Sequence, residues 1–423
     1  MQIAVIGAGI VGVTTAYELA ADGHAVTVFE RRPSVAAEAS FANGGVVAPG
    51  YVAPWAAPGM PTKILAGLWS RHSAVHFGPG ALAAGPWLWR YLRACRKAVH
   101  VRHRSALGAL AQLSRSRMDE LTTSLKLEFE QAQGYLVLLR TPREQARAQK
   151  SLAHLVELGI SHEIIDATRC REIEPALSTD TPLQGAIRLT QDGVGNCRQF
   201  AHLIKAQAQS FGAGFRFGTE VLAITGGLRP QVASRPVEPA DGPTTEAFDA
   251  VVVCGGHEST RLLNPLGLRL PLLPVYGHSL TAQVRHLENG MDLGPRSGVM
   301  DERYKVTVTR LGQRVRVAGG AEIGGRPDRL DTAALATLYK VLKDWFPGAA
   351  ELARVQQWKG ARPMLPDGPP VIGPSPTQGV WLNLGHGSSG WALSCGSARV
   401  LADQVAGRAS ALDLSAFSLD RLR

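Results

Sequence analysis

A glycine-rich turn near the start of the chain has the residue types and spacing of a phosphate-binding loop. Gly7, Gly9 and Gly12 form a G-x-G-x-x-G motif that encloses Ile10 and Val11. The first glycine permits a tight turn, the second lets a pyrophosphate approach the backbone, and the third lets a helix pack closely on a strand. A helix that begins here presents unpaired N–H groups and the positive end of its dipole to an anion. The motif predicts a dinucleotide site but does not separate NAD from FAD.

An acidic residue and a group of small polar residues follow this turn. Glu30 ends the next apolar run, where its carboxylate would accept hydrogen bonds from the ribose hydroxyls of an adenosine. Arg31 follows directly and is assigned to the same site. The SFANGG stretch offers further small donors, and its candidate cofactor ligands are Ser40, Asn43, Gly44 and Gly45.

A second glycine-rich turn lies near the C-terminus, where NLGHGSSGW (383–391) separates an apolar run from a helical pattern. A second backbone-donor site at the far end of the chain suits a ligand longer than one mononucleotide. Its helix N-terminus would face the pyrimidine edge of a flavin, which favours FAD. His386 is interpreted chiefly as a capping or packing residue. The cofactor residues assigned here and in two central strands are Gly385, His386, Gly387, Ser388, Ser389, Gly390, Trp391, Val221 and Gly255.

The elements that must position these residues alternate as in an α/β protein. Apolar runs at 3–6 and 25–29 flank a helical pattern at 10–21, which is a βαβ start with a parallel sheet. Similar pieces return in the middle and at the end of the chain. The predicted fold is therefore α/β, with a Rossmann-like FAD-binding domain interrupted by a β-rich α+β substrate-binding domain. The predicted ranges are 1–50, 190–262 and 355–423 for the first domain, and 51–189 and 263–354 for the second.

Periodicity and turn residues predict the remaining elements. Helices are expected at 85–127, 143–158, 199–211, 332–345 and 388–405. Strands are expected at 134–141, 215–224, 248–254 and 380–384, and a hairpin at 305–317. Residues 41–61 are predicted to form an ordered loop, and 226–245 an exposed loop on a hairpin.

The basic surplus of the chain is concentrated in one window. The 423 residues carry 45 Lys and Arg against 35 Asp and Glu, a formal charge of +10. Residues 90–117 hold eight of these basic residues and no acidic one. Apolar residues recur there at helical spacing, namely Trp87, Leu88, Tyr91, Leu92, Cys95 and Val99. The amphipathic segment 87–117 is either a solvated face or, aided by Trp55, Trp69 and Trp87, an interfacial helix that docks on anionic lipid.

Several classes of protein are excluded by composition. Five scattered cysteines, none in a C-x-x-C pair, indicate neither a disulfide framework nor a zinc or redox site, and no metal is expected. Aromatic residues are only 6% of the chain and no nucleic-acid module is recognisable, so no nucleic-acid partner is expected. Without a targeting segment or an apolar run of about 18 residues, the protein is expected in the cytoplasm, free or on a membrane surface.

Motifs along essentially the whole chain resemble the small subunit of D-amino-acid dehydrogenases, within the D-amino-acid oxidase superfamily. They are GAGIVG, Glu30, SFANGG, PGYVAPWAAPG, DERYKVTVTR, GARPMLPDGPPVIG and NLGHGSSGW, in collinear order. The resemblance implies FAD and oxidative deamination of D-amino acids to 2-oxo acids and ammonia. It also implies electron delivery to a quinone or other respiratory acceptor, at the inner face of the cytoplasmic membrane. No covalent flavin-attachment motif is recognisable, so noncovalent FAD is expected.

The resemblance also implies roles for residues of the substrate pocket. Arg362 matches the arginine that binds the substrate carboxylate, and a guanidinium fork can hold a carboxylate bidentately. Tyr304 matches a tyrosine that donates to the same carboxylate, while Lys305 and Arg310 are weaker candidates. Each of these residues could instead be ordinary surface. Pocket lining or packing is expected for Tyr51, Tyr276 and His278.

The chain departs from the pattern of these relatives at two places. Val46 replaces a glutamine near the flavin, and Tyr276 and His278 replace lysine and tyrosine on the substrate side, so the preferred side chain is open. The hypothesis for the reaction is hydride transfer from the substrate Cα to flavin N5, with the carboxylate held by Arg362. The alternatives are an oxidase or dehydrogenase of glycine, sarcosine, proline or hydroxyproline on the same fold, and a basic adaptor without catalysis.

Overall fold

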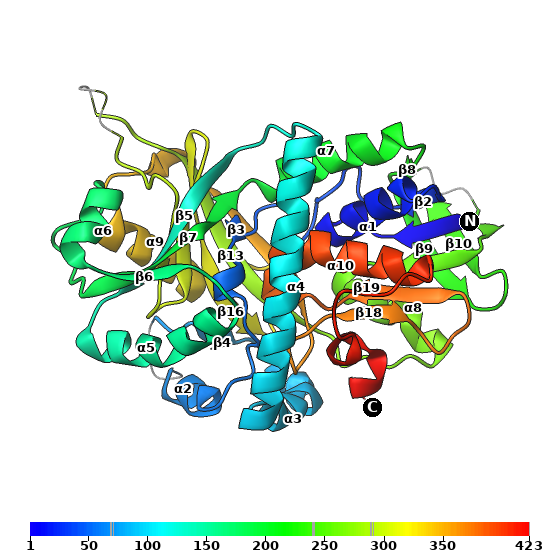
Figure 1. Cartoon of the computed structure of the whole chain (residues 1–423), viewed down its shortest axis with the longest axis horizontal. Coiled ribbons are helices and arrows are strands. Elements are labelled where there is room, and N and C mark those ends of the chain that lie inside the picture. The colour runs from blue at the N-terminus through cyan, green and yellow to red at the C-terminus, as the bar shows by residue number, and fades with distance from the viewer. Residues whose placement is uncertain (68–69, 71, 239–241, 288–289, 291, 423) are drawn as a thin grey trace.

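The N-terminal βαβ unit lies at the centre of a six-stranded sheet. The computed structural model describes residues 1–67, 70, 72–238, 242–287, 290 and 292–422 (Figure 1). In spatial order the sheet contains β18 (Val371–Pro374), β19 (Val380–Leu384), β12 (Ala250–Val253), β1 (Gln2–Ile6), β2 (Ala25–Phe29) and β8 (Gly214–Arg216). All neighbouring strands are parallel except β18 and β19. This arrangement confirms the predicted Rossmann-like α/β fold.

Alternate residues of the central strands enter two different cores, because successive side chains in a strand point to opposite faces. Ile3 and Val5 pack with four helices on one face. Those helices are α1 (Ile10–Ala21), α4 (Lys97–Ser124), α7 (Cys197–Ser210) and α10 (Gly390–Val405). Ala4 and Ile6 pack on the other face, with α8 and a three-stranded sheet. These elements are α8 (Ser259–Leu263), β9 (Thr219–Thr225), β10 (Gln231–Pro236) and β11 (Thr244–Ala247).

A ten-stranded mixed sheet forms the other half of the molecule. Eight of its strands are, in order, β17 (Gln356–Met364), β13 (Leu273–Gln283), β16 (Arg314–Ile323), β15 (Val306–Leu311), β14 (Gly298–Asp301), β5 (Gln131–Leu139), β7 (Gly185–Gly195) and β3 (Val46–Val47). The remaining two pair at the side, β4 (Val75–Phe77) with β16 and β6 (His162–Asp166) with β7. The predicted β-rich part is thus observed. Strands β3 and β17 belong to this sheet although they fall within ranges predicted for the FAD-binding domain, and the domain ranges stay a prediction.

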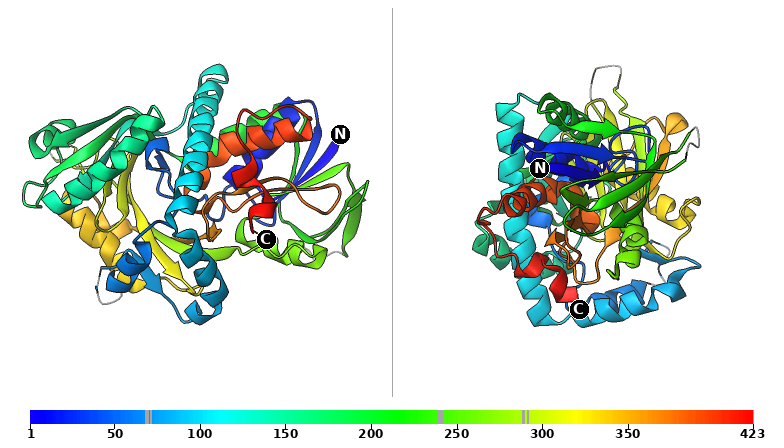
Figure 2. Two further views of the ribbon diagram at one scale, coloured as in Figure 1. Left: turned by 60° about the horizontal axis from the view of Figure 1, so that its bottom comes forward. Right: turned by 90° about the vertical axis from the view of Figure 1, so that its right-hand side faces the viewer.

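Helices cover both faces of the larger sheet. On one face α6 (Ala167–Ile173) and α9 (Thr332–Trp345) pack over an apolar core. On the other face α5 (Pro142–Glu157) packs against β5 and β7. The short helices α2 (Met60–Gly67) and α3 (Gly85–Ala94) lie at the bottom of Figure 1, beside the lower end of α4. Figure 2 shows α4, in cyan, along one side of the molecule, with α3 turning away from its lower end.

Several predicted elements needed correction. The helix expected at 85–127 is broken between α3 and α4, because Arg96 has an extended backbone with ψ of 139° and serves as the N-cap of α4. The strand expected at 215–224 is two strands, β8 and β9, and the loop expected at 226–245 contains β10 and β11. Helix α6 and most of β7 were not predicted, and the ordered loop 41–61 holds β3 and a 3₁₀ turn at Pro49–Tyr51.

Trp87, Tyr91 and Cys95 of the predicted apolar stripe face the protein, whereas Leu92 is exposed, and the choice between a solvated face and an interfacial helix stays a prediction. Trp87 and Tyr91 are buried, their rings stack at 5.4 Å, and Trp87 Nε1 donates to the Met364 carbonyl at 3.1 Å. Together with Leu92, other apolar residues are exposed in this part of the molecule, namely Leu65, Leu82, Trp89 and Val101. Trp69, predicted to aid docking, lies outside the described residues. Arg115 and Arg117 of the window are ion-paired, with Asp119 and with Glu18 and Glu120.

Candidate functional site

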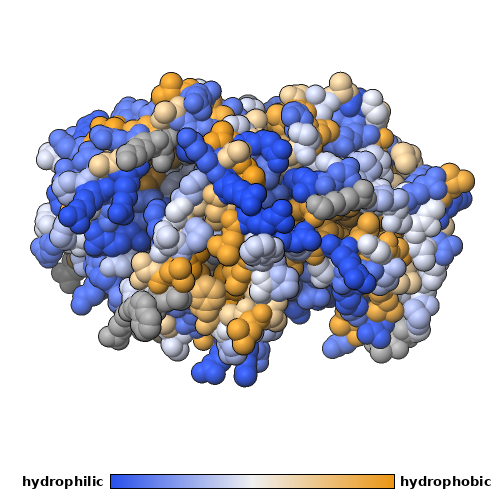
Figure 3. Space-filling model, turned by 90° about the horizontal axis from the view of Figure 1, so that it is seen from below, coloured by the Kyte–Doolittle hydropathy of each residue, from blue (hydrophilic) through white to orange (hydrophobic). Residues whose placement is uncertain are grey.

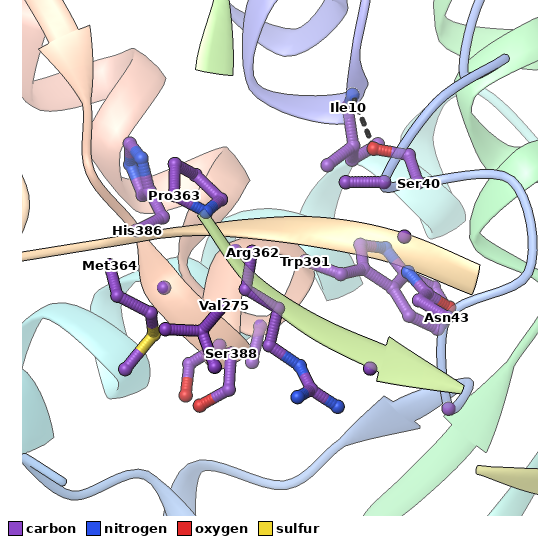
Figure 4. Close-up of a pocket in the computed structure, with 18 of the residues that line it drawn as sticks. Ile10, Ser40, Asn43, Val275, Arg362, Pro363, Met364, His386, Ser388 and Trp391 are labelled. Atoms are coloured by element: carbon purple, nitrogen blue, oxygen red, sulfur yellow. Dashed lines mark hydrogen bonds between the residues drawn. The ribbon is translucent and has the colours of Figure 1, made fainter. Parts of the chain in front are cut away.

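A cavity of about 790 Å³ extends between the two sheets and is lined by both glycine-rich turns. Its walls come from the N-terminal ends of α1 and α10, the 40–60 loop, β13, β17 and the 254–262 segment. Figure 4 shows Ile10 and Ser40 on one side, Trp391 and Asn43 together, and Arg362 between them and Met364. The cavity brings together all the predicted cofactor residues except Gly12.

The first turn has the shape of an anion cradle. Gly7 adopts a positive φ of 100°, which side-chain-bearing residues rarely do, and a Cβ at Gly12 would lie 1.9 Å from the Gly7 carbonyl oxygen. Gly12 thus packs helix against strand, the role its position predicts. Gly9 caps α1 without a side-chain hydrogen bond, and the Ile10 amide donates to Ser40 Oγ at 3.1 Å. The positive end of α1 therefore faces the cavity.

Glu30 is fixed by two backbone amides at the ribose position. Its Oε2 accepts from the Ala8 amide at 2.7 Å and its Oε1 accepts from the Arg32 amide at 2.8 Å. Each carboxylate oxygen retains a second lone pair for a hydroxyl group. Arg31 also lines the cavity and pairs with Glu38 at 3.2 Å.

The C-terminal turn supplies the second cradle. Gly385 and Gly387 have φ values of 82° and 57°, and Ser389 caps α10 without a side-chain hydrogen bond. The buried His386 ring lies 3.0 Å from Ser397 Oγ, and burial lowers its pKa to about 3, so it is neutral. This fits the packing role predicted for His386. The buried Trp391 Nε1 lines the same cavity and has no hydrogen-bond partner among the described residues.

Arg362 extends into the cavity from β17. Its Nη1 donates to the Gly320 carbonyl at 2.6 Å, and no carboxylate of the described residues lies within ion-pair distance of it. Burial without a compensating charge lowers its pKa to about 10, so the guanidinium is still charged at neutral pH. The space it occupies depends on Gly277 of β13, where a Cβ would lie 2.3 Å from Arg362 Nη2. An anion of the substrate would complete this site.

A polar group at another wall of the cavity joins Tyr51 to the hairpin. The Tyr51 hydroxyl donates to Glu302 Oε2 at 3.1 Å and accepts from Lys305 Nζ at 3.0 Å. Lys305 also pairs with Glu302, and its φ of 53° is unusual for a residue with a side chain. Glu302 was missed, although its place in DERYK beside Lys305 was a usable signal.

The structure does not bring all the predicted pocket residues together. Tyr51 and His278 line the cavity, whereas Tyr304 and Tyr276 do not. The Tyr304 ring packs on Arg140, 5.2 Å from its guanidinium carbon. The Tyr276 ring lies 4.5 Å from Lys359 Nζ. The placement of Tyr304 therefore does not support the predicted contact with a substrate carboxylate.

His278 has its ring nitrogen Nε2 directed to the start of α9, where it accepts from the Asp331 amide at 3.2 Å. Burial, followed by the nearby Lys359 charge, lowers its pKa to about 4. A neutral imidazole that accepts at Nε2 carries its proton at Nδ1, and this nitrogen is buried without a hydrogen-bond partner among the described residues.

The donors present fit a dinucleotide that carries a flavin. Two helix N-termini whose own N-cap residues make no side-chain cap, the Glu30 carboxylate predicted to bind ribose, and the unpartnered Trp391 Nε1 line one cavity. Glycines line it where a Cβ would collide with neighbouring atoms, as at Gly44 and Gly385. The fold and this site define a dinucleotide-binding oxidoreductase that holds a flavin.

Comparison with known proteins gives the family. Residues 2–404 match the model of the FAD dependent oxidoreductase family, and the chain belongs to this family. It is 42% identical to a D-amino acid dehydrogenase of Cereibacter sphaeroides, with 100% of this chain and 95% of that protein covered. It is 40% identical to a D-amino acid dehydrogenase of Bradyrhizobium diazoefficiens, with coverage of 100% and 99%. FAD is accordingly its cofactor.

Solved structures show the same fold at lower identity. The glycine oxidase of Geobacillus kaustophilus has a TM-score of 0.73 and 22% identity, covering 99% of this chain and 98% of that one. The L-proline dehydrogenase of P. horikoshii has a TM-score of 0.72 and 18% identity, covering 99% and 97%. These matches confirm the architecture of the two sheets.

Proposed function

We propose that this protein is an FAD-dependent D-amino-acid dehydrogenase. The observation that carries the proposal is Arg362, a half-buried cation with no counter-ion among the described residues, directed into the cavity that both glycine cradles line. A carboxylate is the partner that such a guanidinium fork binds best. The two relatives at 40% and 42% identity, both named D-amino acid dehydrogenase and matched over the full length of this chain, supply the substrate class.

The residues of the chain have positioning roles in this reaction. Arg362 holds the substrate carboxylate, and Gly277 leaves room for its guanidinium. The Tyr51, Glu302 and Lys305 group forms a polar wall of the same cavity. When bound, FAD supplies the hydride acceptor for the substrate Cα–H. A neutral substrate amine assists the loss of hydride with its own lone pair, so no side-chain base is needed, and water then converts the imine to a 2-oxo acid and ammonia.

The finer part of the proposal concerns the acceptor and the membrane. A quinone or another respiratory carrier would receive the electrons, with the protein held at an anionic lipid surface. Exposed Trp89 and Leu92 lie on α3, close in sequence to the exposed basic residues Arg93, Arg96 and Lys97. This mixture of apolar and basic groups is typical of interfacial helices. None of the helices in the described residues is long and apolar enough to cross a membrane.

The experiment that tests the substrate class is anaerobic reduction of the purified holoenzyme. Mixing with paired D- and L-amino acids, and with glycine, sarcosine and proline, is expected to bleach the flavin absorbance fastest with D-amino acids. Bleaching only by L-amino acids or by secondary amines would replace the proposed substrate class. A protein that binds no flavin on reconstitution would instead favour a non-catalytic role.

A further inference from the structure

One part of the wall of the cavity that holds the cofactor residues is made of apolar side chains, and we call this part of the cavity the apolar branch. The branch runs between α5 and the large sheet, and apolar side chains form its walls. They are Val137 of β5, Ile187 and Leu189 of β7, Met300 of β14, and Leu152, Leu155 and Leu158 on or just after α5. Because unpaired charges are costly to desolvate, these walls favour an apolar ligand over a zwitterion.

The branch joins the flavin cradle directly. The cavity is lined at this place by Gly44, Gly45, Val46 and Ala48. Val46 pairs with Val194 of β7, and the same strand β7 forms part of the wall of the branch. Valine at position 46 makes this junction apolar, where a glutamine would have placed an amide. An apolar molecule in the branch can therefore approach the cofactor from a side that Arg362, on the distant strand β17, does not occupy.

Half-buried residues of two helices mark the outer end of the branch. Ala148, Leu152 and His154 of α5 line it on one side and His100 of α4 on the other. The adjoining 54–57 loop is tied to both neighbouring helices. His100 Nδ1 lies 2.8 Å from the Ala56 carbonyl, and the Tyr91 hydroxyl of α3 donates to the Trp55 carbonyl at 3.2 Å.

Helices near this end of the branch carry exposed apolar side chains. Four helices come together at the bottom of Figure 1, namely α2, α3, α5 and the lower end of α4. Seen from that side, Figure 3 shows apolar side chains gathered near the middle of the face with hydrophilic ones around them. Trp89 is 62% exposed, Leu65 is 62% exposed and Leu82 is 94% exposed. A ligand dissolved in lipid would thus reach the branch without crossing bulk water.

We infer that this apolar branch is the binding site of a lipid-soluble quinone, separate from the amino-acid site at Arg362. This rests on the proposed function, and it locates the binding site of the electron acceptor in the apolar branch. A quinone bound here takes up two electrons and two protons and leaves as the quinol, while FAD returns to its oxidised form for the next amino acid. Water-soluble acceptors do not need the branch.

The test places a bulky side chain in the branch and follows the two half-reactions separately. The variants Leu152→Trp and Ala148→Trp lie one helical turn apart at the outer end of the branch. Val156→Trp is the matched control, because Val156 is 67% exposed on the same helix and does not line the cavity. Flavin content and circular dichroism of each holoenzyme establish that it is folded.

Three measurements are made on each holoenzyme. Anaerobic flavin reduction by a D-amino acid reports the first half-reaction, and turnover with decylubiquinone or with ferricyanide reports the second. Calorimetric binding of decylubiquinone to the oxidised protein is a readout independent of turnover. In the branch variants we expect decylubiquinone binding and turnover to fall at least tenfold, with flavin reduction and ferricyanide turnover within twofold of wild type and of Val156→Trp.

Other outcomes overturn the inference. Unchanged decylubiquinone binding in both branch variants would show that the quinone binds elsewhere. Slower flavin reduction in both would make the branch a path for the amino acid. If D-amino acids bleach the wild-type flavin but decylubiquinone neither binds nor reoxidises it, the quinone is wrong while the dehydrogenase function stands. If no D-amino acid bleaches the flavin, the proposed function itself fails.

Discussion

Removing the charge of Arg362 tests the substrate site most directly. Among the described residues the guanidinium has one hydrogen bond, to the Gly320 carbonyl, which leaves its other N–H groups for a ligand. Truncating one partner of a buried, hydrogen-bonded charge pair costs roughly 2–5 kcal/mol. Since about 1.4 kcal/mol corresponds to a factor of ten, Arg362→Ala should weaken binding of the amino acid by roughly 30- to 4000-fold.

The assay is stopped-flow reduction of the flavin, with the apparent Kd taken from the dependence of the rate on D-amino-acid concentration. Arg362→Lys keeps the charge but loses the fork, and should recover part of the affinity. Gly277→Ala should weaken binding with Arg362 intact, because its Cβ would lie 2.3 Å from Arg362 Nη2. Arg354→Ala, an exposed arginine shortly before β17, is the control.

An apparent Kd for Arg362→Ala within threefold of wild type, at normal flavin content, would refute the assignment of Arg362 to the substrate carboxylate. A rise of similar size in Arg354→Ala would show that the effect is one of overall charge and not of this position. Loss of flavin from Arg362→Ala alone would place the residue in the cofactor site instead.

Three further outcomes follow from buried and surface charges. Glu18 is fully buried between Arg117 and Arg399, so Glu18→Gln should lower the free energy of unfolding by on the order of 3–5 kcal/mol. Glu120→Gln is the control, because the Glu120 side chain is exposed and its loss should cost less than about 1 kcal/mol. Urea unfolding midpoints of the holoenzymes measure both effects. Burial raises the pKa of Asp192 from its usual value near 3.8 to about 7, so the folded state binds the extra proton and loses stability as pH rises from about 4 to 7. Melting curves should therefore show that Asp192→Asn is more stable than wild type, by a margin that grows between pH 5 and 8 by at most about 1.4 kcal/mol per pH unit. A margin of equal size at pH 5 and at pH 8 would contradict this. Replacing Arg93 and Lys97 together by glutamine should weaken flotation with anionic vesicles by about 2 kcal/mol, and unchanged flotation would make this a solvated face.

The cofactor turns were predictable because each is made by one short stretch of chain. Gly7, Gly12 and Glu30 stand within one βαβ unit, and their types alone dictate a tight turn, close packing and a ribose acceptor. The fold class followed from the same alternation of apolar runs. Arg362 required the family pattern, since a lone arginine in a strand without alternation of apolar residues carries no periodic signal.

The features that could not be predicted from the sequence depend on contacts between distant segments of the chain. Tyr304 faces away from the cavity because its ring packs on Arg140, which is itself held by Asp301 and Asp344. The apolar stripe of α3 was readable, but whether lipid or protein covers it depended on Met364, whose carbonyl receives the Trp87 indole. Likewise, the pattern of α5 predicts a helix and leaves open whether Leu152 meets packed core or a cavity.

The order of strands in the six-stranded sheet has a consequence for how the protein is made. Strands β1 and β2 leave the ribosome before β12, which pairs with β1 and ends at Val253, and before β19, which ends at Leu384. At roughly 5–20 residues per second, the ribosome needs on the order of 10–45 s to make the chain between β2 and the end of β12. During this interval the open edge of β1, with Ile3 and Val5, is exposed to pairing with other nascent chains. Chaperones that bind apolar segments during synthesis should therefore raise the yield, and a chain that ends before β19 should accumulate as aggregate.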